Sequence, residues 1–297
     1  MPKDPLKADE ARRKMQEAAQ KRNAGPEWHR KQSEAYKGIF DGEIGPFYGK
    51  HHTEETERAC SKNSRPPLLK EYQPIKALLF DMDNTLFDLV GASITACQAV
   101  TRSLGIPEEN ILFPYFLRPL HGFESHENIL DFMQDHRIPV PGSYDRARRI
   151  YEEEKIRHIT PYPGVVETLS RIRDQGLPMG IVTDAHSRDA VLRLEKTGLL
   201  PFFCCMVTYD LVRVKKPAPE PFITALDMLQ SMADEVLMVG DSPRRDIEPG
   251  RTLGIRTVYA RYGDRFSDGR SPVLADYTID TLAELPEILS RFSGTNV

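Results

Sequence analysis

Short apolar runs that end in polar residues recur along the second part of the chain. They read KALLFDMD (76–83), PMGIVTDA (178–185), CCMVTYD (204–210), EVLMVGDS (235–242) and IRTVYA (255–260). Amphipathic stretches with helical spacing separate the last four runs, at 186–197, 219–231 and 243–253. Apolar strands that alternate with helices are typical of a parallel sheet covered on both faces. The pattern therefore predicts an α/β fold.

The first interval between these runs is much longer than the others. About 90 residues separate Asp83 from the run at 178–183, whereas a parallel crossover needs only about a dozen. Most of the excess has a helical pattern, at 89–104, 124–136, 143–158 and 164–175. We expect an inserted helical subdomain here.

Residues 1–73 differ in charge from the rest of the chain. They hold 15 Lys and Arg against 12 Asp and Glu, a net charge of +3, whereas the remaining residues hold 25 against 32, a net charge of −7. A proline-rich stretch, NSRPPLLKEYQP, then disfavours helix and reads as a linker. We expect a basic N-terminal extension, mostly helical or disordered, followed by a separate core.

Polar residues of the core gather where the predicted strands end. Asp81, Thr183 and Asp241 each follow such a strand. Ligands of open parallel sheets bind outside the carboxyl ends of the strands. These three residues, far apart in sequence, are therefore expected on one rim.

The acidic residues on this rim suit a divalent cation. Mg²⁺ prefers oxygen ligands. Burying a neutral polar group without a hydrogen-bond partner costs roughly 2–7 kcal/mol, and burying an unpaired carboxylate costs more. We expect the Asp81 carboxylate, the backbone carbonyl of Asp83 and the Asp241 carboxylate to bind Mg²⁺. Asp246 is placed to hold a metal-bound water or to orient Lys216.

A lysine completes the predicted site. Lys216 precedes Pro217, which favours extended backbone at Lys216 and directs its side chain inwards, so that the adjacent Lys215 faces solvent. A carboxylate, a cation, a hydroxyl and a fixed ammonium suit phosphoryl transfer. Asp81 would attack phosphorus, and Asp83 would protonate the leaving alkoxide and then deprotonate water.

Four stretches carry a family resemblance. DMDNT (81–85), VTD (182–184), KKP (215–217) and GDSPRRD (240–246) resemble, in order, the four motifs of haloacid-dehalogenase-superfamily phosphatases. The resemblance covers about 74–292. It implies a Rossmann-like, HAD-like core at 74–87 and 161–292, a helical C1-type cap at 88–160 and a short tail at 293–297. It also implies Mg²⁺ and an aspartyl-phosphate intermediate.

Roles follow from the matching positions. The resemblance implies that Asp81 is the nucleophile and Asp83 the acid/base. The residues expected to act are, for catalysis, Asp81, Asp83, Thr183 and Lys216; for phosphate binding, Asn84, Thr183, Asp184 and Lys216; for metal binding, Asp81, Asp83 and Asp241; and in support, Ser242 and Asp246.

The substrate class is narrowed by a second resemblance. The presence of Asp83 favours phosphate esters over the haloacids of the dehalogenases. RTVYARYGD and ADYTIDTLAELPEIL resemble archaeal-type phosphatases that act on glyceraldehyde 3-phosphate or phosphoglycolate. Arg118, His121 and His126 of the cap are candidates for selecting the substrate.

The N-terminal extension supports an alternative. GPFYGKHHTEETERACSK and the preceding RKQSEAYKG resemble short modules beside homing-type nucleases that are thought to contact DNA. The alternative function is a nucleic-acid-associated protein in which the core acts on nucleic-acid ends or serves as scaffold. The core's net −7 argues against a long phosphate-binding track there, because duplex affinity comes largely from Lys and Arg.

Two further features concern the compartment. No apolar run approaches the roughly 20 residues that span a bilayer, and the cysteines form no CxxC pair. We expect a cytoplasmic chain with no membrane partner and with a small phosphorylated substrate.

Overall fold

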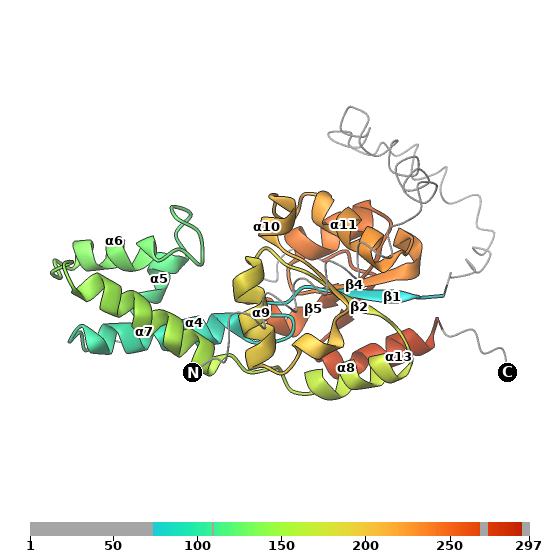
Figure 1. Cartoon of the computed structure of the whole chain (residues 1–297), viewed down its shortest axis with the longest axis horizontal. Coiled ribbons are helices and arrows are strands. Elements are labelled where there is room, and N and C mark those ends of the chain that lie inside the picture. The colour runs from blue at the N-terminus through green and yellow to red at the C-terminus, as the bar shows by residue number, and fades with distance from the viewer. Residues whose placement is uncertain (1–73, 109, 268–272, 293–297) are drawn as a thin grey trace, which may run out of the picture.

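The computed structural model describes residues 74–108, 110–267 and 273–292. The predicted extension at 1–73 and the tail at 293–297 lie outside these residues. A parallel sheet forms the centre, in the order β3-β2-β1-β4-β5-β6 (Figure 1). Its strands are β1 (Ala77–Phe80), β2 (Met179–Val182), β3 (Cys205–Val207), β4 (Val236–Gly240), β5 (Arg256–Ala260) and β6 (Tyr277–Ile279).

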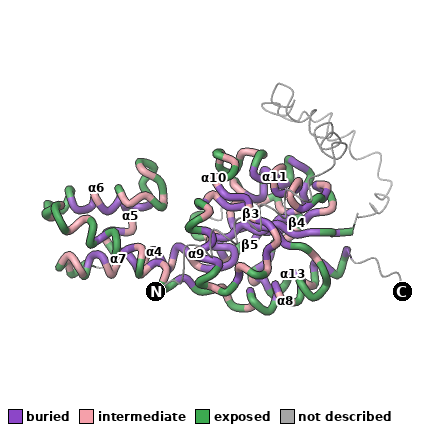
Figure 2. Tube along the Cα trace, in the orientation of Figure 1, coloured by how far each residue is buried: buried purple, intermediate pink, exposed green. Residues whose placement is uncertain are grey.

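Helices cover both faces of the sheet, which explains why the central strands β1, β2 and β4 are apolar throughout. Every residue of β1, β2 and β4 is buried (Figure 2). One face packs against α8 (Val165–Asp174), α9 (Ser187–Lys196) and α13 (Leu285–Ser290). The other packs against α11 (Glu220–Leu229), with Leu253 after α12 (Glu248–Thr252) in the same cluster. The predicted parallel α/β sheet is confirmed.

The long first interval folds into helices that lie to one side of the sheet (Figure 1). They are α4 (Leu89–Ser103), α5 (Phe113–Phe116), α6 (Glu127–Asp135) and α7 (Ser143–His158). They share an apolar cluster of their own. Within it the rings of Phe116 and Tyr151 stack with centroids 4.8 Å apart. These helices therefore bury a core separate from the two on the sheet.

Some elements differ from the sequence prediction. The helix predicted at 124–136 begins only at Glu127, so that residues 124–126 belong to the preceding loop. The helix predicted at 243–253 begins as a π-helical turn, η3 (Pro243–Ile247), before α12, since Pro249 in the first turn has no N–H to continue one regular ladder. Strand β6 and the short helices α5, α10 (Tyr209–Val212) and α13 were not predicted.

The remaining short elements connect the layers. They are α10 (Tyr209–Val212) and the 3₁₀ turns η1 (Leu200–Phe202), η2 (Ala233–Glu235), η4 (Arg261–Gly263) and η5 (Leu282–Glu284). Over the described ranges, none of the helices combines the length and apolarity that a membrane crossing requires.

Candidate active site

The predicted rim residues come together at the carboxyl ends of the strands. The backbone N–H of Asp81 donates to the carbonyl of Val239 (2.9 Å), which continues the β1–β4 pairing by one residue. The N–H of Thr183 donates in the same way to Val207 (2.9 Å). Both residues are buried. Continuing the ladder holds each of them at a fixed height on the rim.

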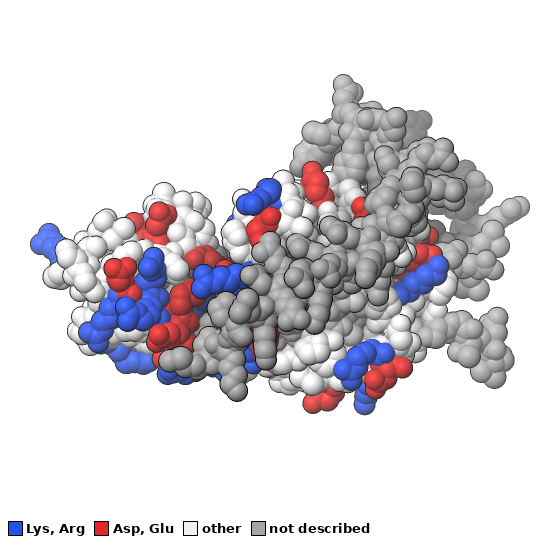
Figure 3. Space-filling view, viewed as in Figure 1, with Lys and Arg blue, Asp and Glu red and all other residues white. Residues whose placement is uncertain are grey.

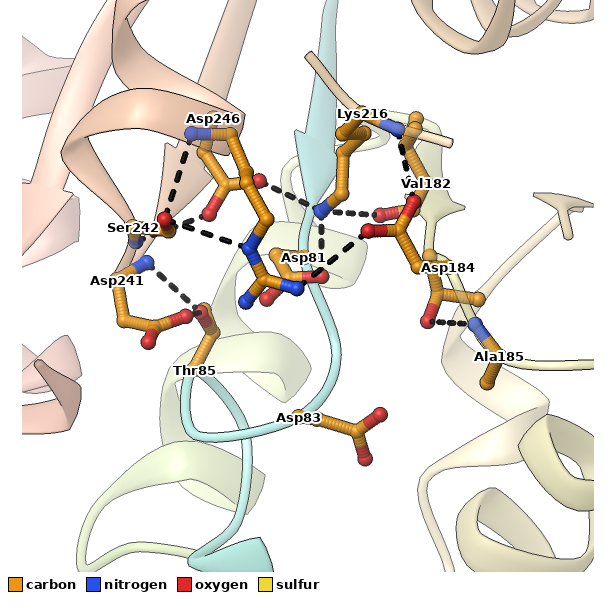
Figure 4. A network of polar contacts seen from close by, with 12 residues as sticks. Asp81, Asp83, Thr85, Val182, Asp184, Ala185, Lys216, Asp241, Ser242 and Asp246 are labelled. Atoms are coloured by element: carbon orange, nitrogen blue, oxygen red, sulfur yellow. Dashed lines mark hydrogen bonds and ion pairs between the residues drawn. The ribbon is translucent and has the colours of Figure 1, made fainter. Parts of the chain in front are cut away.

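Lys216 lies at the centre of the site (Figure 4). Its Nζ donates to Oδ1 of Asp81 at 2.7 Å and to Oδ1 of Asp246 at 2.6 Å. A third bond reaches the carbonyl of Val182 at 3.1 Å. Its backbone N–H donates to Oδ1 of Asp184 at 2.9 Å. The three bonds to Nζ fix a buried ammonium between two carboxylates.

Charge at the site favours the ionised form of Asp81. Burial opposes ionisation of Asp81, but Lys216 and Arg245 outweigh it, so the pKa of Asp81 lies below its ordinary value. Burial also opposes the ammonium form of Lys216, but Asp246 and Asp81 raise its pKa. Asp81 is therefore a carboxylate and Lys216 a cation at neutral pH.

Three carboxylates meet on the same rim. Ligand oxygens of Asp81, Asp241 and Asp246 lie within 4.8 Å of one another, and all three residues are buried. Burial, reinforced by Asp81 and Asp246, raises the pKa of Asp241 well above its ordinary value. A cluster of oxygen donors that repel one another in this way fits a hard divalent cation, which would relieve the repulsion.

The fourth motif packs tightly to build this cluster. A Cβ at Gly240 would lie 2.5 Å from Cβ of Asp246, so a larger residue would displace that carboxylate. The N–H of Ser242 donates to Oδ2 of Asp246 at 3.0 Å, and Ser242 Oγ accepts from the N–H of Arg245 at 3.3 Å. Ser242 thus caps η3 and supports Asp246, whose other oxygen is bound by Lys216.

The candidate phosphate ligands Thr183, Asn84 and Asp184 differ in their hydrogen-bond partners. Thr183 Oγ1 accepts from the N–H of Ala185 (3.2 Å) at the cavity. The Asn84 carbonyl oxygen accepts from the N–H of Val90 (3.1 Å) and so supports the start of α4, which leaves the amide NH₂ as its donor. The carboxylate of Asp184 binds the backbone of Lys216 and cannot itself attract a phosphate.

Asp83 has surroundings of its own, apart from the Asp81–Lys216 group (Figure 4). Its Oδ2 accepts from Nη1 of Arg193 at 2.7 Å, while among the described residues its buried Oδ1 has no hydrogen-bond partner. Burial raises the pKa of Asp83 to about 6, against the opposing effect of Arg193. The pKa values of the two aspartates of the first motif are therefore shifted in opposite directions.

A cavity of about 750 Å³ opens beside these groups. It is lined by Asp81, Asp83 and Lys216 of the rim and, from the loop between α5 and α6, by residues that include His121, Phe123 and Glu124. Of the three cap candidates, His121 lines it. Arg118 instead lies 3.5 Å above the Tyr115 ring, and His126 binds Glu152 at 2.7 Å.

Several residues of the site were not predicted. Thr85 Oγ1 accepts from the N–H of Asp241 and donates to its Oδ1, both at 3.1 Å, and Arg245 Nη1 lies 3.4 Å from Asp184. Both belong to motifs that were recognised, so closer attention to each motif could have found them. Arg193 and Glu124 carry no local signal.

The comparisons with known proteins identify the class. Residues 78–260 match the family model of the haloacid dehalogenase-like hydrolases. The match extends over more than half of the chain, and the chain belongs to this family. Residues 30–61, outside the described residues, match the NUMOD3 motif, in agreement with the resemblance to nuclease-associated modules.

Particular relatives match most of the chain. The chain is 29% identical to the glyceraldehyde 3-phosphate phosphatase of Methanocaldococcus jannaschii, over 73% of this chain and 98% of the relative. It is 31% identical to the phosphoglycolate phosphatase of Chromobacterium violaceum, over 73% and 97%.

Two solved structures show the same fold. An HAD phosphatase from Thermococcus onnurineus aligns with TM-score 0.51 and 28% identity, over 72% of this chain and 98% of that one. The 2-haloacid dehalogenase from Pseudomonas syringae aligns with TM-score 0.53 and 23% identity, over 74% and 100%. At 23% identity the second likeness concerns the fold alone.

Proposed function

We propose that this chain is a Mg²⁺-dependent phosphatase that hydrolyses a small phosphorylated metabolite through an aspartyl-phosphate on Asp81. The observation that carries the proposal is the pairing of Asp81 with Lys216 at 2.7 Å beside Asp241 and Asp246, in the wall of the cavity. A buried carboxylate kept ionised next to a fixed cation is a nucleophile placed for a dianionic phosphoryl group.

The first half-reaction forms the covalent intermediate. A carboxylate oxygen of Asp81 attacks phosphorus, the P–O bond to the leaving group breaks, and the leaving oxygen takes a proton from Asp83. Lys216 and Thr183 hold the phosphoryl oxygens, with backbone and amide donors around Asn84 and Asp184. In the second half-reaction Asp83 takes a proton from water, which attacks the aspartyl-phosphate and releases phosphate and Asp81.

The oxygen donors of the rim would hold Mg²⁺. Asp81 and Asp241 would supply carboxylates and Asp83 its backbone carbonyl, while Asp246, bonded to Lys216, would lie in support. The cation would neutralise charge on the phosphoryl oxygens. Asp241, whose pKa is raised first by burial and then by its acidic neighbours, is the residue that most needs this partner.

The division of the chain follows from the same picture. We propose a core at 74–87 and 161–292 that carries the chemistry and a cap at 88–160 that covers the leaving group. The relatives named above act on glyceraldehyde 3-phosphate and on phosphoglycolate, so these two esters are the first to test, followed by other sugar phosphates and nucleotides. If the enzyme hydrolyses none of these esters, the proposed substrate class is wrong.

Removing the divalent cation is expected to abolish turnover. With the metal gone, Asp81, Asp241 and Asp246 repel one another and the incoming phosphate dianion. Phosphate release should fall to background in EDTA and return when excess Mg²⁺ is added. Full activity in the chelator would contradict the metal assignment.

A second activity is favoured by the NUMOD3 match at residues 30–61. We propose that the basic segment 1–73 contacts DNA. On the face seen in Figure 3, most of the visible Lys and Arg residues lie together with Asp and Glu over the helices at the left. Residues 74–297 carry a net charge of −7, so the core offers less to a duplex.

Residues 1–73 are expected to bind DNA and to be dispensable for catalysis. The full chain is expected to shift a duplex in a mobility assay at low salt and to release it at higher salt. A chain that starts at residue 74 should not shift the duplex and should hydrolyse a small phosphate ester as fast as the full chain. Equal DNA binding by both chains, or an inactive but folded short chain, would contradict this division.

A further inference from the structure

Arg193 is a charged residue buried in the core at the boundary with the cap. It lies on α9, and its side chain is only 1% exposed. Its Nη1 donates to Oδ2 of Asp83 at 2.7 Å, and its Nη2 donates to Oε1 of Glu124. Burying a guanidinium is costly unless it is paired and hydrogen-bonded. Two carboxylates supply that pairing: Asp83, in the turn after β1, and Glu124 of the cap.

Glu124 belongs to the cap side of this contact. It lies in the loop before α6 and lines the cavity. Lys155 of α7 is 3.8 Å from its Oε1 and donates to Glu152 at 2.9 Å. Ionic contacts therefore run without a break from α7 of the cap through Glu124 and Arg193 to Asp83.

The neighbouring residue makes a second contact between cap and core. The Phe123 ring packs edge-on against Phe266, with centroids 6.0 Å apart. Phe266 lies in the loop after η4 of the core. Consecutive cap residues thus contact two separate parts of the core, Phe123 against Phe266 and Glu124 against Arg193.

We propose that Arg193 is a positioning residue: held by Glu124 of the closed cap, it binds only Oδ2 of Asp83 and leaves Oδ1 turned to the leaving group. This inference rests on the proposed function, because it assigns a support to the acid/base of that reaction. It adds that the proton-transferring oxygen is presented only when the cap is closed.

The geometry explains why Glu124 is needed. A guanidinium binds one carboxylate through two parallel N–H bonds when both nitrogens are available. Here Glu124 occupies Nη2, so Asp83 receives one bond and its Oδ1 stays without a partner among the described residues. Without Glu124, Nη2 is released to take Oδ1 of Asp83 as well. Both oxygens are then engaged, and the acid is withdrawn from the leaving group.

The experiment compares substrates that need a general acid with one that does not. An alkyl phosphate has a poor leaving group and depends on proton transfer from Asp83, whereas p-nitrophenyl phosphate releases a stable anion. Rapid-quench measurement of the first turnover isolates formation of the aspartyl-phosphate from its hydrolysis. Folding is followed by circular dichroism and thermal unfolding.

The variants test each side of the contact. Glu124→Ala should slow the first turnover of the alkyl ester by about 10²-fold, the size of a lost general acid or of a misplaced one, and that of p-nitrophenyl phosphate by less than about threefold. Glu124→Gln keeps an oxygen acceptor for Nη2 and should stay close to the parent. Glu153→Ala, at an exposed glutamate of α7, is the matched control and should not change the ratio of the two rates.

Arg193→Met completes a double-mutant cycle. It should lower the same ratio, and adding Glu124→Ala to it should cause no further loss, because both changes act through one contact. If Arg193→Met does not fold, the Glu124 variants decide alone. Equal slowing of both esters by Glu124→Ala, or additive losses in the cycle, would overturn the inference. A parent enzyme that hydrolyses neither ester would instead overturn the proposed function, and the inference with it.

Discussion

An Asp81→Asn variant is expected to fold normally and to lose turnover of every phosphate ester. The amide has the shape of the carboxylate but cannot attack phosphorus, and removing the nucleophile of a covalent mechanism lowers kcat by roughly 10⁶-fold in a well-studied case. Lys216 keeps its bonds to Asp246 and to the carbonyl of Val182, at 2.6 and 3.1 Å, so the loop that carries it should stay in place.

A control at the surface separates chemistry from general damage. Asp174→Asn makes the same substitution at a side chain that is 73% exposed. Its kcat should remain within a few-fold of the parent, as expected for a surface charge. Both variants should give the circular dichroism spectrum of the parent. Appreciable turnover by Asp81→Asn would show that another group attacks phosphorus.

Replacing Lys216 is expected to have the second largest effect. Lys216→Met keeps most of the buried stem but removes the ammonium that lies 2.7 Å from Asp81. Loss of a preorganised charge at the reacting centre lowers kcat by about 10²- to 10³-fold. The variant also leaves buried Asp246 without its cation, so thermal unfolding is measured alongside steady-state kinetics.

Lys215→Met is the matched control because it changes the adjacent residue. Lys215 is exposed, and its Nζ lies 5.3 Å from the centroid of the Tyr209 ring rather than on Asp81. Its kcat should stay within a few-fold of the parent. If Lys215→Met is the impaired variant and Lys216→Met is not, the lysine assignment is wrong.

The central strands could be predicted because each is buried on both faces. A strand such as β4, with every residue buried, must be apolar along its length and must end where polar residues begin. Strand β6 escaped prediction because it has only three residues, of which Thr278 is exposed. A run so short has no distinguishable period.

Some residues of the site could be predicted from the sequence and others could not. Residues of the four motifs are recognisable locally, because each follows a strand and carries an unusual acid, hydroxyl or lysine. The Arg193–Glu124 contact joins positions 69 residues apart. Arg193 sits in an amphipathic helix where an arginine ordinarily faces solvent, and Glu124 falls in a loop that the helical pattern had included in a helix. Only in the folded chain does Arg193 contact both Glu124 and Asp83.

Chemical trapping of the intermediate tests the central claim most directly. The enzyme is quenched during turnover and reduced with borohydride, which converts an aspartyl-phosphate to homoserine, and its peptides are then sequenced by mass spectrometry. We expect homoserine at position 81, only when substrate is present and not in Asp81→Asn. Homoserine at another position, or its absence from an enzyme that is turning over substrate, would contradict a covalent mechanism on Asp81.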